Sequence, residues 1–179
     1  MAVRAVLSAA TRPALLTGGV VALHLVMAGL FACRRPERDR APLHTWMSAL
    51  PSLVLGALVT IGSGDRIGPL AAALFVLGAL GAVASMLTLG RSFAVLPGAR
   101  ALVVRGPYRV VRHPMYASEL LMFAALVAPL GAPRALVALV LAALALALRI
   151  RAEEHVLAVL PGHGAYRQQV PFRLVPGLW

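Results

Sequence analysis

The chain is poor in charged residues and contains no lysine. Charged residues make up only 13% of its 179 residues, and 17 arginines stand against six acidic residues. Soluble domains are about a quarter charged, and a chain this short has little interior in which to bury apolar surface. A hydrophobic fraction of 60% and a mean hydropathy of +0.86 therefore predict an all-α integral membrane protein instead of a soluble domain.

Cysteine and clustered metal ligands are also scarce. Cys33 is the single cysteine, which excludes an internal disulfide framework. The five histidines are scattered along the chain, so we expect no metal site. The sequence has no phosphate-binding loop, nucleophile elbow, zinc-helix motif or soluble dinucleotide fingerprint. These absences argue against the common soluble classes of hydrolase, nucleotidase and dehydrogenase.

Five apolar runs are long enough to approach the thickness of a bilayer. They cover Ala14–Cys33, Leu43–Ile61, Pro69–Leu89, Met115–Leu130 and Arg134–Ile150. We expect one membrane domain over residues 1–179, with three spans in 1–89. Residues 90–179 would supply a polar cofactor-binding loop, a helical hairpin and a C-terminal helix extension that reaches about Leu160. Pro161-Gly162 should end that extension.

The arginines predict how the spans are oriented. Thirteen of the seventeen fall on the side that holds the loops 34–40 and 90–114 and the C-terminal tail. The positive-inside rule places that side in the cytoplasm and the N-terminus outside, as in a bacterial plasma membrane. A net charge of +11 can indicate nucleic-acid binding. Here the arginines lie at span ends, so we expect contacts with lipid headgroups and no nucleic-acid partner.

Two polar clusters should meet at this cytoplasmic side. With Ala132 as the turn of the hairpin, His113 lies 19 residues before it and Glu153 lies 21 residues after it. A rise of about 1.5 Å per residue puts both residues roughly 30 Å from the turn. This is about one hydrocarbon thickness, so the two residues should share one level at the interface.

Three groups of side chains are candidates for chemistry. Residues 102–116 combine arginines, His113 and two tyrosines, which could also form an ordinary basic and aromatic interface. Arg149 and Glu153 are spaced i, i+4 and share a helix face, whereas Arg151 and Glu154 fit a solvated exit turn. Glu119 lies one turn inside the fourth span, where an unpaired charge is costly. Both a functional role and a structural ion pair with a nearby arginine are open for it.

The order of these motifs resembles a known family of membrane enzymes. Gly106-Pro107-Tyr108, then Arg112-His113-Pro114-Met115-Tyr116, and then Glu153-Glu154 resemble the isoprenylcysteine carboxyl methyltransferases and their bacterial phospholipid-methyltransferase-like relatives. The tail from Leu160 to Trp179 resembles the ending of many bacterial members. The resemblance covers about Gly90 to Trp179.

The resemblance implies S-adenosylmethionine as the co-substrate, held between the polar loop and the helix of Glu153-Glu154. Glu153 would hold its ammonium or ribose, and Arg149 would meet the acceptor. The remaining cofactor contacts implied by motif position are Arg100, Ala101, Leu102, Val103, Tyr108, His113, Pro114, Met115 and Tyr116. Two departures stand out, because His163 replaces a frequent tyrosine and Arg100 replaces the histidine of eukaryotic members.

The chemistry of the side chains agrees with methyl transfer. Arg112 or His113 suits the carboxylate of the methyl donor. An acceptor carboxylate needs no base and could be oriented by Arg149, which favours carboxyl O-methylation of an isoprenoid or other lipid-like molecule. An amine or hydroxyl acceptor would need a base, for which Glu119 or His163 are candidates.

Two other functions are compatible with the sequence. A small membrane transporter or scaffold would use the arginines only for topology and lipid binding. A membrane reductase would use them to bind the phosphate of NADPH, although this leaves Glu153 without a role.

Overall fold

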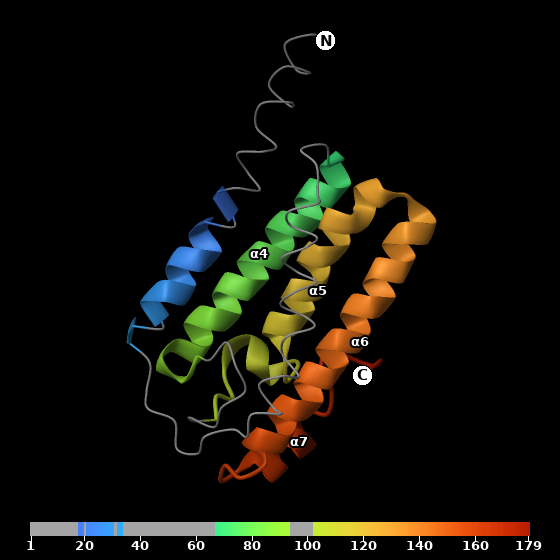
Figure 1. The fold of residues 1–179 in the computed structure, drawn as a ribbon. Coiled ribbons are helices and arrows are strands. Elements are labelled where there is room, and N and C mark those ends of the chain that lie inside the picture. The colour runs from blue at the N-terminus through green and yellow to red at the C-terminus, as the bar shows by residue number, and fades with distance from the viewer. Residues whose placement is uncertain (1–17, 20, 31, 34–66, 94–101) are drawn as a thin grey trace.

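The computed structural model describes residues 18–19, 21–30, 32–33, 67–93 and 102–179. After an apolar helix at Val21–Leu30, the longer helices are α4 (Pro69–Leu89), α5 (Pro114–Val127) and α6 (Ala132–Leu157). Short elements complete the chain: η1 (Gly90–Ser92), η2 (Gly106–Arg109), η3 (Ala128–Leu130) and α7 (His163–Gln169). The regular structure of the described residues is helical, as the composition predicted (Figure 1).

The predicted span boundaries agree closely with the helices. α4 begins at Pro69 and ends at Leu89 as expected. The fourth predicted span appears as α5 followed by η3, and the fifth lies within α6. Within the described residues, Pro69–Ser92 and Ala132–Leu157 are long and apolar enough to cross a membrane. The second predicted span falls outside these residues, so the number five stays a prediction.

Glycine allows α4 and α5 to pack closely. A Cβ atom on Gly78 would lie 2.6 Å from Cγ of Met122 and 2.9 Å from the carbonyl oxygen of Ser118. Small residues at such contacts let the backbones of membrane helices approach each other. Phe75 of α4 packs against Ala125 of α5 beside this contact. This close packing against α4 fixes the position of α5.

α5 and α6 form the predicted hairpin. Gly131 adopts a φ of 82° between η3 and α6, a backbone conformation that glycine tolerates best. Near this turn Phe123 and Val127 pack against Ala142. At the other end Tyr116 packs against Leu146 and Ile150, which brings the N-terminal end of α5 beside the C-terminal part of α6.

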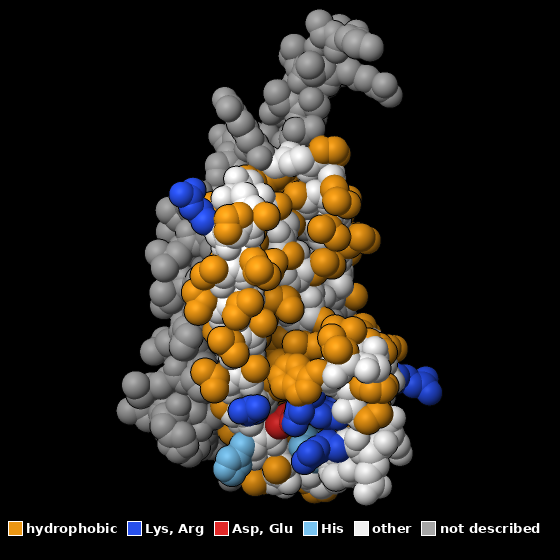
Figure 2. Space-filling model, turned by 90° about the vertical axis from the view of Figure 1, so that its right-hand side faces the viewer, with side chains coloured by type: hydrophobic (Ala, Val, Ile, Leu, Met, Phe, Trp, Pro, Cys, Tyr) orange, Lys and Arg blue, Asp and Glu red, His pale blue; other side chains and the backbone are white. Residues whose placement is uncertain are grey.

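Apolar and charged side chains separate along the length of the molecule. Hydrophobic side chains cover much of the coloured face in Figure 2, and most of its cationic, acidic and histidine side chains gather at one end. The exposed apolar residues of α6 are Leu136, Val137, Val140, Leu141, Leu144 and Leu148. This pattern suits a lipid-facing helix with a polar end. The C-terminal end of α6 leads directly to α7 (Figure 1).

The segment after α6 contains an element that the sequence did not predict. α6 ends at Leu157, and Gly162 with a φ of 83° precedes the short helix α7. The tail then returns to the start of α5. The backbone N–H groups of Arg112 and His113 donate to the carbonyl oxygens of Phe172 and Arg173, each at 2.9 Å.

Candidate functional site

The two polar clusters meet as their depth predicted. His113 precedes α5 and Glu153 lies near the end of α6, yet Nδ1 of His113 is 3.8 Å from Oε2 of Glu153. Pro114 opens α5 at its first position, where its missing N–H has no cost. Because a residue before proline is kept out of the helical region, His113 has φ −127° and ψ 58°. The loop thereby turns into the helix at the histidine.

Three charged residues, here called the clasp, join the loop, α6 and the tail. Glu154 accepts from Nε of Arg112 at 2.8 Å through Oε1 and from Nε of Arg173 at 3.0 Å through Oε2. The predicted solvated exit turn is therefore wrong for Glu154, which is buried, whereas Arg151 is exposed as expected. The sequence could not show this burial, because the two cationic partners of Glu154 come from distant segments. Arg112 lies in the loop before α5, and Arg173 lies in the tail.

Arg112 also binds the backbone of the tail. Its Nη1 donates to the carbonyl oxygens of Val170 and Pro171, both at 2.7 Å. Its side chain is 5% exposed, so these acceptors and Glu154 satisfy a cation removed from water. Arg112 therefore anchors the tail, and its predicted contact with the carboxylate of a methyl donor stays a prediction.

A second set of contacts, here called the inner network, leads from the clasp into the helix hairpin. The rings of His113 and Tyr116 stack with centroids 5.7 Å apart, and the guanidinium of Arg149 lies 4.9 Å from the Tyr116 centroid. Nη1 of Arg149 is 3.8 Å from Oε2 of Glu119. The ion pair that the sequence left open for Glu119 is therefore present. Arg149 is 3% exposed, whereas the Glu119 side chain is 33% exposed.

Glu153 has an oxygen that fits a ligand. Its Oε2 is buried and has no hydrogen-bond partner among the described residues, because 3.8 Å from His113 is too long for a hydrogen bond. Buried polar atoms are almost always paired. A cationic or hydroxyl group of a bound molecule would satisfy this oxygen, and the ammonium or ribose of S-adenosylmethionine has that chemistry.

The other predicted cofactor contacts differ in how deeply they are buried. Leu102 and Val103 lie half-buried in the loop before η2, and Tyr108 and Pro114 are buried. Met115 packs in the apolar clusters on both sides of α5. Arg100 and Ala101 lie outside the described residues. The cofactor roles of all these residues stay predictions.

A tyrosine hydroxyl of α7 connects that helix with the loop. Tyr166 donates its hydroxyl to the carbonyl oxygen of Tyr108 at 2.7 Å. Burial raises the pKa of Tyr166 to about 12 and that of Tyr108 well above its usual range, so both stay protonated at neutral pH. Burial also lowers the pKa of His163, which keeps its ring neutral. His163 lies in the electrostatic field of Glu154 and Arg112, beside the clasp.

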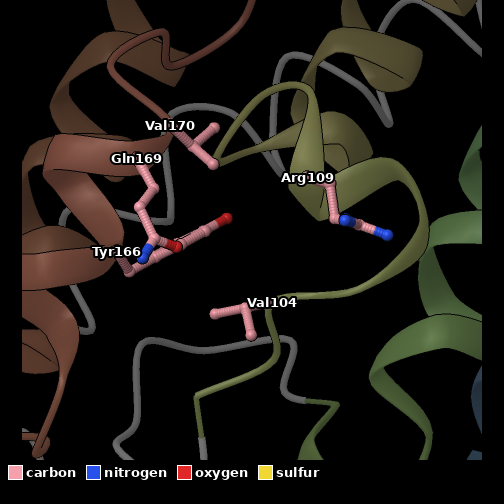
Figure 3. A pocket seen from close by; sticks show the side chains of 5 residues that line it. All are labelled: Val104, Arg109, Tyr166, Gln169 and Val170. Carbon is pink, nitrogen blue, oxygen red and sulfur yellow. The ribbon is translucent and has the colours of Figure 1, made fainter.

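A cavity of about 210 Å³ lies between the loop and α7. Figure 3 shows Tyr166, Gln169 and Val170 on one side, Val104 across from them and Arg109 at the far side. Sequence reasoning did not single out Gln169 or Val170. No local pattern could have found them, because the cavity exists only after α7 folds back against the loop.

Comparison with known families gives one match. Residues 68–160 match the family model described as phospholipid methyltransferase (PEMT), which covers more than half of the chain. The matched segment includes α4, α5 and α6, and with them His113, Arg149 and both glutamates of the C-terminal pair. No curated protein matches the sequence significantly.

Proposed function

The chain belongs to the phospholipid methyltransferase family and is a membrane methyltransferase that uses S-adenosylmethionine, and from this premise we propose how it binds its acceptor. The polar group of a lipid-like molecule lies beside Arg149, and the favoured reaction is carboxyl O-methylation. Because the chain belongs to this family, we set aside the two alternative functions, a transporter or scaffold and an NADPH-dependent reductase.

The observation that carries the proposal is the continuity of the inner network. Glu153 lies next to His113, and the ring of His113 stacks on the ring of Tyr116. The guanidinium of Arg149 lies over the same Tyr116 ring. The residues expected to hold the methyl donor and the residue expected to meet the acceptor are therefore linked by direct contacts. Arg149 also lies on the helix that presents an apolar surface, along which a lipid tail can reach the site.

On the donor side, Glu153 holds the ammonium or ribose of S-adenosylmethionine. The backbone of Leu102 and Val103 runs beside it, and Tyr108 and the turn at residues 113–116 complete the pocket. The co-substrate supplies a methyl group on a sulfonium, whose sulfur leaves as a neutral thioether. The protein mainly aligns the two reactants and excludes water, which accounts for much of the rate of such a displacement.

On the acceptor side, Arg149 orients a carboxylate by charge-assisted hydrogen bonds. Tyr116 fixes the guanidinium from one side. A carboxylate oxygen forms the new O–C bond while the S–C bond breaks, and no proton has to move. This step therefore requires no general base.

An amine acceptor is the second candidate, and Glu119 favours it. This carboxylate is 33% exposed and lies 3.8 Å from Arg149. In N-methylation the acceptor ammonium would give a proton to Glu119 before its nitrogen attacks the methyl group. The N–C bond then forms as the S–C bond breaks.

We propose that the site faces the cytoplasm and that the N-terminus lies outside. The arginine distribution supports this orientation, and the co-substrate is made in the cytoplasm. Fusion of a reporter enzyme to the C-terminus tests it. Activity of a cytoplasmic reporter is expected, and activity of a periplasmic reporter alone would contradict the orientation.

The acceptor is tested with labelled S-adenosylmethionine and a host lipid extract. Alkali releases the label from a methyl ester as methanol, whereas an N-methyl group retains it. Arg149→Ala should keep donor binding in calorimetry and lose most turnover, and the exposed Arg151→Ala is the matched control. A collapse of donor affinity in Arg149→Ala would show that Arg149 does not act on the acceptor.

A further inference from the structure

Two helix faces meet beside Arg149. On α5, Tyr116 and Leu120 are spaced i, i+4 and share a face. On α6, Leu146 and Ile150 have the same spacing, and Arg149 lies between them in the sequence. Tyr116, Leu146 and Ile150 form a buried cluster, and the guanidinium of Arg149 is 4.9 Å from the Tyr116 ring centroid. A ligand whose polar group meets Arg149 therefore has this apolar cluster beside it.

The tail adds a third side to these two faces. Leu174 and Trp179 both pack against the cluster, and both keep part of their surface exposed. Figure 1 shows the end of the tail beside α6. A partly buried aromatic side chain still has apolar surface with which it can cover an apolar group of a ligand. The tail therefore places an apolar wall next to the residue expected to meet the acceptor.

Trp179 is held in position by other groups of the tail. Its main-chain oxygen accepts from the backbone N–H groups of Arg173 and Leu174 at 2.8 and 2.9 Å and of Val175 at 3.3 Å. The guanidinium of Arg173 lies 5.1 Å from the centroid of the indole, which is a cation–π contact. Nε of Arg173 also donates to Glu154 at 3.0 Å. The clasp thereby fixes the indole, and the wall is already formed before a ligand arrives.

We propose that Trp179 is a specificity-determining residue whose indole contacts the apolar chain of the acceptor close to the group that is methylated. The inference rests on the proposed function, because it takes Arg149 as the residue that meets the acceptor. A polar linker next to the methylated group would face the indole and the apolar cluster, where its hydrogen bonds to water are lost. The wall therefore favours acceptors in which the apolar chain begins next to the methylated group.

Stearic acids that carry a spin label serve as carboxylate probes of this wall. Electron paramagnetic resonance measures the bound fatty acid as an immobilised signal that Arg149→Ala removes. Trp179→Ala should raise the dissociation constant of 5-doxylstearate by about tenfold or more, since a lost tryptophan contact often costs this much. Trp179→Phe keeps an aromatic face and should stay within about threefold. The exposed neighbour Leu178 gives the matched control, and Leu178→Ala should bind the probe as the unaltered protein does.

A fluorescence measurement covers the case in which Trp179→Ala does not fold. Trp46→Phe leaves Trp179 as the single tryptophan of the chain. A doxyl group quenches an indole only at short range. The label of 5-doxylstearate lies near the carboxyl group and should quench Trp179 strongly, whereas the label of 16-doxylstearate lies at the far end and should quench it weakly. Arg149→Ala should abolish this difference.

The possible results separate the inference from the proposed function. Equal quenching of Trp179 by the two isomers, or tight binding of the fatty acid by a folded Trp179→Ala variant, would overturn the wall while leaving Arg149 as the acceptor residue. If no immobilised signal depends on Arg149, the carboxylate acceptor beside Arg149 is wrong, and the inference fails with it. Stronger quenching by the isomer labelled near the carboxyl group supports both.

Discussion

Adjacent glutamates offer a sharp test of the site, because Glu153 and Glu154 have opposite surroundings. Replacing each by glutamine removes one charge and changes the side-chain volume little. Glu154 accepts three contacts from cationic or donor groups, at 2.8, 3.0 and 3.4 Å. Oε2 of Glu153 accepts no hydrogen bond from the described residues. The two variants should therefore damage different properties of the protein.

The loss of stability expected for Glu154→Gln follows from the hydrogen-bond partners of Glu154. A glutamine has one acceptor oxygen, so its amide group must face either Arg112 or Arg173. At least one hydrogen bond to a charged group is lost, worth about 1.5–3 kcal/mol. Removing one partner of a fully buried ion pair costs about 3–5 kcal/mol, but Arg112 keeps two carbonyl acceptors in the tail. We expect a loss of about 2–4 kcal/mol in the free energy of unfolding.

Glu153→Gln should behave in the opposite way. Its free energy of unfolding should fall by less than that of Glu154→Gln, because Oε2 of Glu153 accepts no hydrogen bond from the described residues and lies 3.8 Å from His113. Its affinity for S-adenosylmethionine should fall at least tenfold, because the carboxylate that meets the ammonium is lost. Unfolding in detergent and calorimetric titration measure the two properties separately. An equal loss of stability in both variants would refute the division of roles between the glutamates.

Three further predictions concern packing, pH and the loop contact. Gly78→Ala should destabilise the protein by about 1–3 kcal/mol, since its Cβ would meet the α5 backbone, whereas Gly81→Ala meets a movable hydroxyl and should cost less; equal losses in detergent unfolding would contradict this. Because burial lowers the pKa of His163, the unfolded chain binds its proton more readily, so stability should fall as pH drops below about 6.5. His163→Gln should weaken that dependence, and an unchanged pH profile would count against it. Tyr166→Phe should cost about 1–3 kcal/mol by leaving the carbonyl of Tyr108 without its hydroxyl donor; unaltered stability would show that water replaces the bond.

The helices and their pairing were predictable because their causes are local. The apolar runs predicted where α4, α5 and α6 begin and end to within a few residues. The tight turn at Gly131 predicted the hairpin, and the constant rise of a helix predicted that His113 and Glu153 lie at one level. The match of motif order with a known family predicted methyl transfer from S-adenosylmethionine, which the family comparison confirms, whereas carboxyl O-methylation stays a prediction.

The division of roles among the charged residues was not predictable. Glu154 looked like part of a solvated turn because its partners are distant, Arg112 being 42 residues earlier in the chain. Arg112 in turn binds the carbonyl of Val170, 58 residues later. Helix α7 also escaped the sequence reasoning, since it is only seven residues long and lies in a segment read as a tail. Contacts between distant residues leave no spacing signal in a single sequence.

The sequence by itself determined that this is a membrane protein and about how long its described helices are, because both depend on hydrophobicity. It also determined the level at which the polar residues lie, because a helix has a fixed rise per residue. Only the tertiary structure decided that the tail returns to the start of α5 and surrounds Glu154 with cations. That return leaves an oxygen of Glu153 unsatisfied. The difference between the two neighbouring carboxylates thus comes from which distant groups the fold brings to each.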